Sequence, residues 1–358
     1  MKIDVFPHIL PRTFHSQMCA LSERAGFMIQ RTADIPAMID LEERFRIMDR
    51  FPGYQQVLTL PGPPLEVLGN EKTSPELARI ANDGMAELVE KYPDRFVAFV
   101  ASLPMNNIEA ALAEIDRVVQ QLGGRGVQIY SNVNGKPLDA PEFRPLFERM
   151  AAHDLPVWLH PTRAVNFSDY PVEKKSHYEI WWLFGWPYET SAAMARLVFS
   201  GLFDSLPNLK IITHHMGAMA PYFAGRLGSG LDLLGVRTSE EDSALVQHTL
   251  QRRPIDYFRM FYADTALFGA AAAMECGLAF FGVDHVLFGT DMPFDPEGGP
   301  GFIRDTIGAL DAMNLSSSDR AKIYEENARK LLKLPVRQIQ NAGRPLPMAR
   351  GNLSQKTP

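Results

Sequence analysis

The sequence predicts an α/β fold, a (β/α)8 TIM barrel in which eight parallel strands alternate with helices, and 358 residues suffice for one such domain. Eight short runs rich in β-branched and aromatic residues mark the expected strands: 2–6, 56–60, 96–101, 126–130, 157–160, 210–214, 261–264 and 286–289. Most of these runs are continuously apolar, as expected for strands that helices bury on both faces. A doubly wound open sheet is the alternative fold.

Helical periodicity fills the segments between these runs, which predicts helices at 75–92, 107–122, 141–153, 191–203 and 298–313. Two insertions interrupt the minimal barrel, at about 12–45 and 162–190. Both follow strands at the end where barrel enzymes carry their active sites. The second insertion is rich in aromatic residues and is expected to form a lid or a dimer contact. We expect one barrel domain over 1–335 and a C-terminal extension, extended or partly disordered, over 336–358.

Composition restricts the class of partner. The formal charge is -6 with both signs interspersed, and no Lys/Arg block suggests a nucleic-acid or membrane surface. The two cysteines, Cys19 and Cys276, lie far apart and form no metal-binding motif or disulfide framework, which fits a reducing cytoplasm. We expect no signal peptide and no membrane-spanning segment. The sequence therefore favours a cytoplasmic protein that acts on a small molecule.

Polar side chains stand where the expected strands end. His8, His160, His215 and Asp291 follow the first, fifth, sixth and eighth strands. A lone histidine beside an apolar strand is more often structural, but all four strand ends face one mouth of a barrel, so these side chains can converge. Imidazole and carboxylate groups are ligands that suit Zn²⁺, Mn²⁺ or Fe²⁺.

Two further polar residues, His214 and Asp264, also stand at strand ends. His214 is expected to pack or to orient the adjacent His215, and to be the less active of the pair. Asp264 ends the seventh strand and either orients His215 or makes a structural hydrogen bond.

Several motifs occur in one order along the chain: His8-Ile-Leu-Pro, Leu206-Pro-Asn-Leu-Lys-Ile, His215-Met-Gly and Gly289-Thr-Asp-Met-Pro-Phe. With these motifs the sequence resembles the decarboxylase-type amidohydrolases, the family of aminocarboxymuconate-semialdehyde decarboxylase, over about residues 1 to 335. The resemblance implies a barrel with one divalent metal per subunit, expected to be zinc, with manganese or iron as alternatives. It also implies non-oxidative removal of CO₂, or a related lyase or hydrolase step, and a homodimer or higher homo-oligomer.

The resemblance assigns roles to individual positions. It implies that His8, His160 and Asp291 are metal ligands, and that His215 is the catalytic acid or base, with Asp291 as a second proton carrier. Substrate-binding roles are implied for Arg226, which would reach a neighbouring subunit's substrate carboxylate, and for the aromatic residues Trp182 and Phe294. An ordinary surface or interface ion pair is an equal interpretation of Arg226. Arg31, on the first insertion, is a weaker candidate for binding the carboxylate.

One position departs from the family pattern. Phe6 stands where the family has the first ligand of a His-x-His pair, and phenylalanine has no lone pair to offer. The metal is then held by His8, His160 and Asp291 with His215 or water, or it binds more weakly or is another ion, or it is absent. A retained metal is the preferred interpretation, because three protein ligands still make a catalytic site. Phe6 is then expected to border an open coordination position that suits an aromatic substrate.

Three functions follow. The leading one is a metal-dependent decarboxylase of a small aromatic or ring-cleaved carboxylic acid. The second is a metal-dependent hydrolase of a C–C, lactone or amide bond on a similar substrate. The third is a metal-free barrel whose activity is lost or altered at Phe6.

Overall fold

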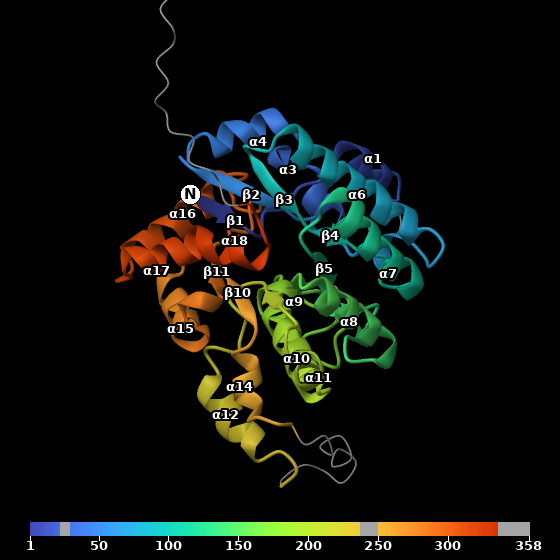
Figure 1. The fold of residues 1–358 in the computed structure, drawn as a ribbon. Helices are drawn as coiled ribbons and strands as arrows, with labels where there is room; N and C mark the ends of the chain where they lie inside the picture. The colour runs from blue at the N-terminus through green and yellow to red at the C-terminus, as the bar shows by residue number, and fades with distance from the viewer. Residues whose placement is uncertain (22–28, 237–249, 336–358) are drawn as a thin grey trace, which may run out of the picture.

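Parallel strands form the centre of the molecule (Figure 1). The computed structural model describes residues 1–21, 29–236 and 250–335. The strands are β1 (Lys2–Asp4), β2 (Tyr54–Leu58), β3 (Phe96–Phe99), β4 (Ala101–Ser102), β5 (Val127–Tyr130), β8 (Val157–His160), β9 (Ile211–Thr213), β10 (Tyr262–Asp264) and β11 (Val286–Leu287). The ladders run β1-β2-β3 and β4-β5-β8-β9-β10-β11, and each pair within them is parallel.

Backbone hydrogen bonds join the two ladders into a ring. β3 and β4 are two parts of one strand path, broken at Val100, whose N–H donates to Leu58 O at 2.9 Å. On the opposite side Val5 N–H donates to Phe288 O at 2.9 Å, which joins β1 to the end of β11. The ring is therefore closed, the predicted TIM barrel with its eight strands is confirmed, and the open-sheet alternative is wrong.

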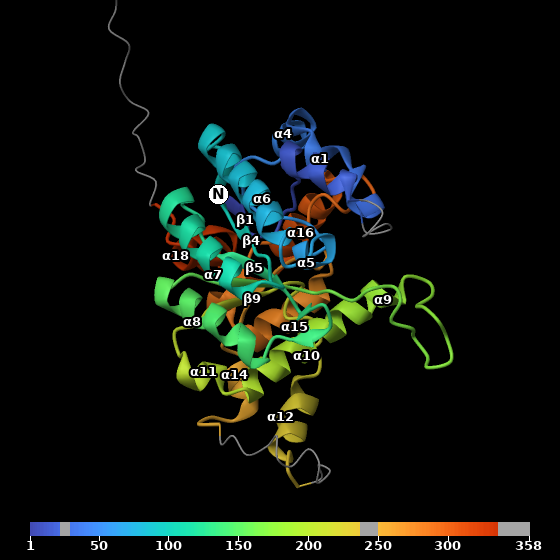
Figure 2. The same cartoon turned by 90° about the vertical axis from the view of Figure 1, so that its right-hand side faces the viewer.

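Helices surround this ring, as Figures 1 and 2 show together. They are α1 (Arg12–Ala20), α3 (Pro36–Ile39), α4 (Leu41–Met48), α5 (Leu65–Leu68), α6 (Ser74–Lys91), α7 (Ile108–Arg117), α8 (Arg144–His153), α9 (Ile180–Leu183), α10 (Gly185–Phe199), α11 (Leu202–Ser205), α12 (Ala224–Asp232), α14 (Pro254–Phe258), α15 (Ala271–Phe281), α16 (Pro300–Ala312), α17 (Ser317–Ala321) and α18 (Asn327–Leu331). A π-helical segment, Val118–Leu122, extends α7, and a second, Lys322–Glu326, joins α17 to α18. A short hairpin of β6 (Asn132–Val133) and β7 (Lys136–Pro137) follows β5.

Helix α10 begins earlier than the sequence predicts. Its first residue is Gly185, whereas helical spacing in the sequence starts at residue 191. The first turn of α10 contains Trp186, whose ring packs at 5.6 Å from the His160 ring. Burial of this aromatic side chain against the barrel outweighs the loop-like composition of the segment.

Side chains fill the interior of the ring. Apolar residues that alternate along the strands, such as Ile3 and Val5 on β1 and its extension, form one buried cluster with Trp158 and Ile212. The Trp158 indole N–H crosses the interior and donates to Val5 O at 3.0 Å. The barrel is thus a packed core, and open space is left to its mouth.

The first insertion is held down by a buried arginine. Its helices α1, α3 and α4 cover the barrel beside α6, and the fully buried Arg44 of α4 reaches the strands. Arg44 donates to Gln56 Oε1 at 2.8 Å, to His8 O at 2.8 Å and to Ala37 O at 2.9 Å. Loss of one acceptor would leave a buried N–H group without a partner, so these hydrogen bonds fix the insertion against the backbone of His8.

The second insertion is mostly loop before α9, and Figure 2 shows this segment projecting from the barrel. Within the three described ranges, no helix has the length and apolar character needed to cross a bilayer. The predicted C-terminal extension, 336–358, lies outside the described residues. The division of the chain at residue 335 stays a prediction.

Candidate active site at the barrel mouth

His8 lies just past β1 and is completely buried. Its backbone N–H donates to Met292 O at 2.7 Å, and its Nδ1 lies 3.1 Å from the Thr59 hydroxyl. Its Nε2 is 3.1 Å from Asp291 Oδ1, although the contact lacks the geometry of a hydrogen bond. Backbone and ring contacts together therefore aim Nε2 of His8 into the mouth.

His160 is the last residue of β8. Its Nδ1 donates to Pro161 O at 2.7 Å, because a carbonyl oxygen can only accept. The proton on Nδ1 leaves a lone pair on Nε2. His160 lines the cavity at the mouth, so this nitrogen is available to a ligand there.

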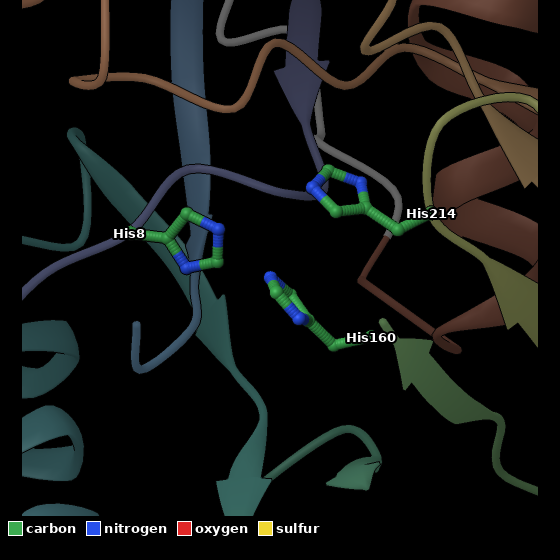
Figure 3. A group of neighbouring side chains, drawn as sticks. All are labelled: His8, His160 and His214. Carbon is green, nitrogen blue, oxygen red and sulfur yellow. The ribbon is translucent and has the colours of Figure 1, made fainter. Parts of the chain in front are cut away.

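His214 directly follows β9 and is also completely buried. Its Nδ1 donates to Asp264 Oδ2 at 2.6 Å, and its Nε2 is buried without a hydrogen-bond partner. Ligand nitrogens of His8, His160 and His214 all lie within 4.8 Å of one another, and Figure 3 shows the three rings pointing toward a common point. His214, His215 and Asp291 meet the same distance criterion.

Charge at the site favours a cation. Burial would raise the pKa of Asp291, but contacts with His214, His215 and His8 hold this pKa well below its usual range. Burial lowers the pKa values of His8, His160 and His215. Burial also opposes charge on His214, yet the Asp264 carboxylate prevails and raises the pKa of His214 to about 9. The neutral imidazoles of His8 and His160 beside the ionised Asp291 carboxylate are donors that suit a catalytic zinc, manganese or iron ion.

The buried and unpartnered Nε2 atoms of His8 and His214 support the same conclusion, since a buried polar atom needs a partner. Of the three ligands that the sequence suggests, His8 and His160 belong to one candidate group, and His8 also lies 3.1 Å from Asp291. His214 belongs to both groups and links His8 and His160 to Asp291, and these donors fit a divalent metal ion. Their role as ligands stays a prediction.

The structure places His215 beside this group. Its Nε2 is 3.6 Å from Asp291 Oδ2, and its side chain is 14% exposed, whereas that of His214 is 0% exposed. Its backbone N–H donates to Asp264 Oδ1 at 3.0 Å. His215 and Asp291 both have positive φ values, 56° and 63°, which is backbone strain of the kind found at functional sites.

The structure adds to the expected role of His214. The sequence suggests that His214 packs or orients His215, and its ring does pack against Phe6 and His215, but it also belongs to the candidate ligand group. Asp264 holds the His214 ring and only the backbone of His215. Strand alternation could have revealed this, because Ile212 faces the barrel interior and a residue two positions later points the same way.

A cavity of about 330 Å³ opens above the histidines. Its lining includes Arg31, Thr32, Ile35, Gly62, His160, Trp182, Trp186, Phe268, Asp291, Phe294 and Phe302. Trp182 and Phe294 are thus at the cavity, and their contact with a substrate stays a prediction. Most of this wall is apolar and aromatic, with Arg31, His160 and Asp291 as its ionisable groups, which suits a small aromatic acid.

Two predicted substrate contacts lie elsewhere. Phe6 is 0% exposed and lies outside the cavity lining, because its ring packs against His214 at 3.8 Å. The His214 imidazole stacks on Phe6, and the expected open coordination position beside Phe6 stays a prediction. Arg226 is exposed on α12 and does not line the cavity of its own chain.

Arg31 joins the two insertions across the mouth. Its guanidinium pairs with Glu179 of the second insertion, and it lies 5.3 Å from the Trp182 ring centre and 5.5 Å from that of Trp181. Glu179 also accepts a hydrogen bond from the Trp182 indole N–H. These contacts position a positive charge in the cavity wall.

Known proteins resemble this chain over most of its length. A sequence model of the amidohydrolase family matches residues 18–334. Gamma-resorcylate decarboxylase of Rhizobium radiobacter is 32% identical over 320 residues, which cover 84% of this chain and 89% of that protein. The fold is similar to dihydroxybenzoic acid decarboxylase from Polaromonas sp., solved with bound manganese and the inhibitor 2-nitroresorcinol (TM-score 0.74, 28% identity, 93% of this chain and 96% of that one). It is also similar to 5-carboxyvanillate decarboxylase from Sphingomonas paucimobilis (TM-score 0.77, 25% identity, 93% and 99%).

Proposed function

Because the chain belongs to the amidohydrolase family, we propose that it is a metal-dependent decarboxylase of a small aromatic carboxylic acid. The observation that carries the proposal is that His160 and Asp291 line an aromatic cavity while His8 lies close to both of them. Relatives named for decarboxylation of hydroxybenzoates support a substrate that bears a hydroxyl group beside its carboxylate.

His8, His160 and Asp291 would hold the ion. A bound divalent metal would supply positive charge that orients the substrate's oxygen atoms and offsets the negative charge developing on the ring. Zinc is the ion expected from the sequence, and the manganese in a related structure makes manganese an equal candidate. Reconstitution of metal-free protein with each ion, followed by activity measurement, decides between them.

The reaction breaks the bond between the ring carbon and the carboxylate and forms a C–H bond at the same carbon. The site must therefore deliver one proton. His215 is suited to this step, because its Nε2 is 3.6 Å from Asp291 Oδ2 and its partly exposed ring lies 5.8 Å from Phe268 of the cavity wall. Burial lowers the pKa of His215, and the nearby Asp291 opposes this effect by favouring the protonated imidazole that would donate the proton.

A cation is also needed for the substrate carboxylate. Arg31 is suited to this role in the same chain, because it lines the cavity. Arg226 fits the role only in an oligomer, since its own cavity excludes it. A homodimer in which Arg226 enters the neighbouring mouth stays a prediction. Light scattering with chromatography gives the oligomeric state, and loss of activity in Arg226→Ala without loss of metal would support the exchange.

The decisive experiment is product analysis on metal-loaded protein with a panel of hydroxybenzoates. We expect one CO₂ and one phenol for each acid consumed. A product formed by addition of water, with no CO₂, would instead establish the hydrolase alternative. Metal content below about 0.1 ion per chain after incubation with Zn²⁺ or Mn²⁺ would establish the metal-free alternative. The cytoplasmic location expected from the cysteine usage stays a prediction.

A further inference from the structure

At one position where the family has a metal ligand, this chain has a residue that cannot coordinate a metal. Phe6 stands there, and its ring can neither coordinate an ion nor reach the cavity. His8, His160 and Asp291 alone give three ligands. Another residue of the chain lies where a fourth ligand could act.

His214 has the geometry of a ligand. Its Nε2 is 3.5 Å from Asp291 Oδ1 and, as part of the ligand group, within 4.8 Å of ligand nitrogens of His8 and His160. Asp264 accepts a hydrogen bond from His214 Nδ1–H at 2.6 Å, so that in the neutral imidazole the lone pair lies on Nε2. A carboxylate behind an imidazole is the usual support of a metal-bound histidine, because it fixes both tautomer and ring plane.

Phe6 completes this support. Its ring stacks on His214 with centres 3.8 Å apart and planes 15° apart. Phe6 is 0% exposed, so it cannot turn away from the imidazole without opening a void in the core. The residue that removes one ligand therefore provides the surface on which another is held.

We propose that His214 is a metal ligand that replaces the one missing at Phe6, so that His8, His160, His214 and Asp291 share the ion. The inference rests on the proposed metal site. It changes the composition of that site, because the histidine comes from β9 rather than from the end of β1.

A competing interpretation has the same four side chains at the site but no bond between His214 and the metal. In it, a protonated His214 forms an ion pair with Asp291 and never contacts the metal. The two interpretations differ in the number of imidazoles bound to the ion and in the effect of removing His214. Both differences can be measured without an assay of enzymatic activity.

The test uses purified full-length protein, with Zn²⁺ as the probe. Zinc-edge X-ray absorption counts the imidazoles, and competition with a chromophoric chelator gives the affinity. Three imidazoles are expected in the unmodified protein and two in His214→Ala. Affinity should fall by about 100-fold or more in His214→Ala, beyond the range usual for residues that only support a ligand. Circular dichroism checks that the variant is folded.

His215→Ala is the matched control, since it removes the adjacent histidine at the end of the same strand. It should retain three imidazoles and an affinity within about threefold of the unmodified protein, a difference of less than 1 kcal/mol. The double variant Phe6→His/His214→Ala should regain a third imidazole by restoring the family's ligand position.

The outcomes separate the two levels of the argument. An unmodified protein that binds no Zn²⁺ overturns the metal-dependent function and this inference with it. A protein that binds Zn²⁺ through two imidazoles, or through a third that His215→Ala removes, overturns the inference alone. If His214→Ala does not fold, the imidazole counts of the unmodified protein and of His215→Ala still decide the question.

Discussion

The Asp264 carboxylate accepts a hydrogen bond from His214 Nδ1 at 2.6 Å, and both side chains are completely buried. The other carboxylate oxygen accepts from the backbone N–H groups of His215 and Ala266, each at 3.0 Å. One aspartate thus fixes both the ring of His214 and the backbone beyond it.

Asp264→Asn should weaken metal binding by about 10-fold to 100-fold, the usual effect of losing such a support. The asparagine oxygen can keep the backbone hydrogen bonds, but its NH₂ group would face Nδ1 and force the proton onto Nε2. Chelator competition measures the loss. Asp295→Asn is the control, because Asp295 is buried at the mouth and accepts backbone hydrogen bonds from Glu297 and Gly301 without contact to the ligands. Equal losses in the two variants would contradict the role of Asp264.

His215→Asn should lower kcat by about 100-fold or more while metal content stays at one ion per chain, because a positioned acid contributes a factor of that order. Steady-state kinetics and metal analysis on the same sample provide the measurement. His177→Asn, on the exposed second insertion, should leave both quantities unchanged. Retained turnover in His215→Asn would remove this residue from the mechanism.

Arg31→Gln should raise KM for the acid by about 10-fold to 100-fold, since a charged hydrogen bond contributes roughly 1.5–3 kcal/mol. The arginine lines the cavity, and its loss removes the positive charge that would face the carboxylate. Arg163→Gln is the matched control, because Arg163 follows β8 but pairs with Glu189 and lines a different cavity. An unchanged KM in Arg31→Gln would leave Arg226 of a neighbouring chain as the candidate.

Glu66→Gln should change how stability depends on pH. Glu66 lies on α5, is 6% exposed, and has one carboxylate oxygen without a hydrogen-bond partner. Burial raises its pKa from 4.5 to about 8. The folded state therefore keeps a proton that the unfolded state releases. The contribution of Glu66 to stability is greatest below pH 4.5 and is lost as pH rises through 8, by up to roughly 5 kcal/mol in total.

Thermal unfolding from pH 5 to pH 9 tests this prediction. The unmodified protein should lose stability over this range by more than the variant does, because glutamine does not titrate. The two melting temperatures should diverge as pH rises, with the variant higher at pH 9. Parallel curves across the range would show that Glu66 has an ordinary pKa.

The barrel could be predicted from the sequence because its strands are buried on both faces, which produces apolar runs that are hard to mistake. His8, His160 and Asp291 could be found for a related reason: each polar residue lies at the end of such a run or two residues past it. Residues 96 to 102 look like one strand in the sequence. In the structure Val100 divides them into β3, which pairs with β2, and β4, which pairs with β5.

Other parts of the site could not be found in this way. Arg44 lies on a short helix of an insertion. No sequence motif indicates that its guanidinium donates a hydrogen bond to the backbone of His8. The sequence places Phe6 near the end of a strand, where it is expected to line the cavity. Only the structure shows that Phe6 is buried and that His214 stacks on its ring. The start of α10 at Gly185 depends on the contact of Trp186 with His160, which is distant in sequence.

The hydrogen bond from Val5 to Phe288 has a consequence for the order in which the chain folds and its site forms. It is the seam at which the first strand meets the last, and His8 and Asp291 lie just beyond it on either side. A chain emerging from the ribosome carries His8 from the start but cannot pair it with Asp291 until almost all of the barrel has been synthesised. A metal site between His8 and Asp291 would therefore be completed only after this seam has closed.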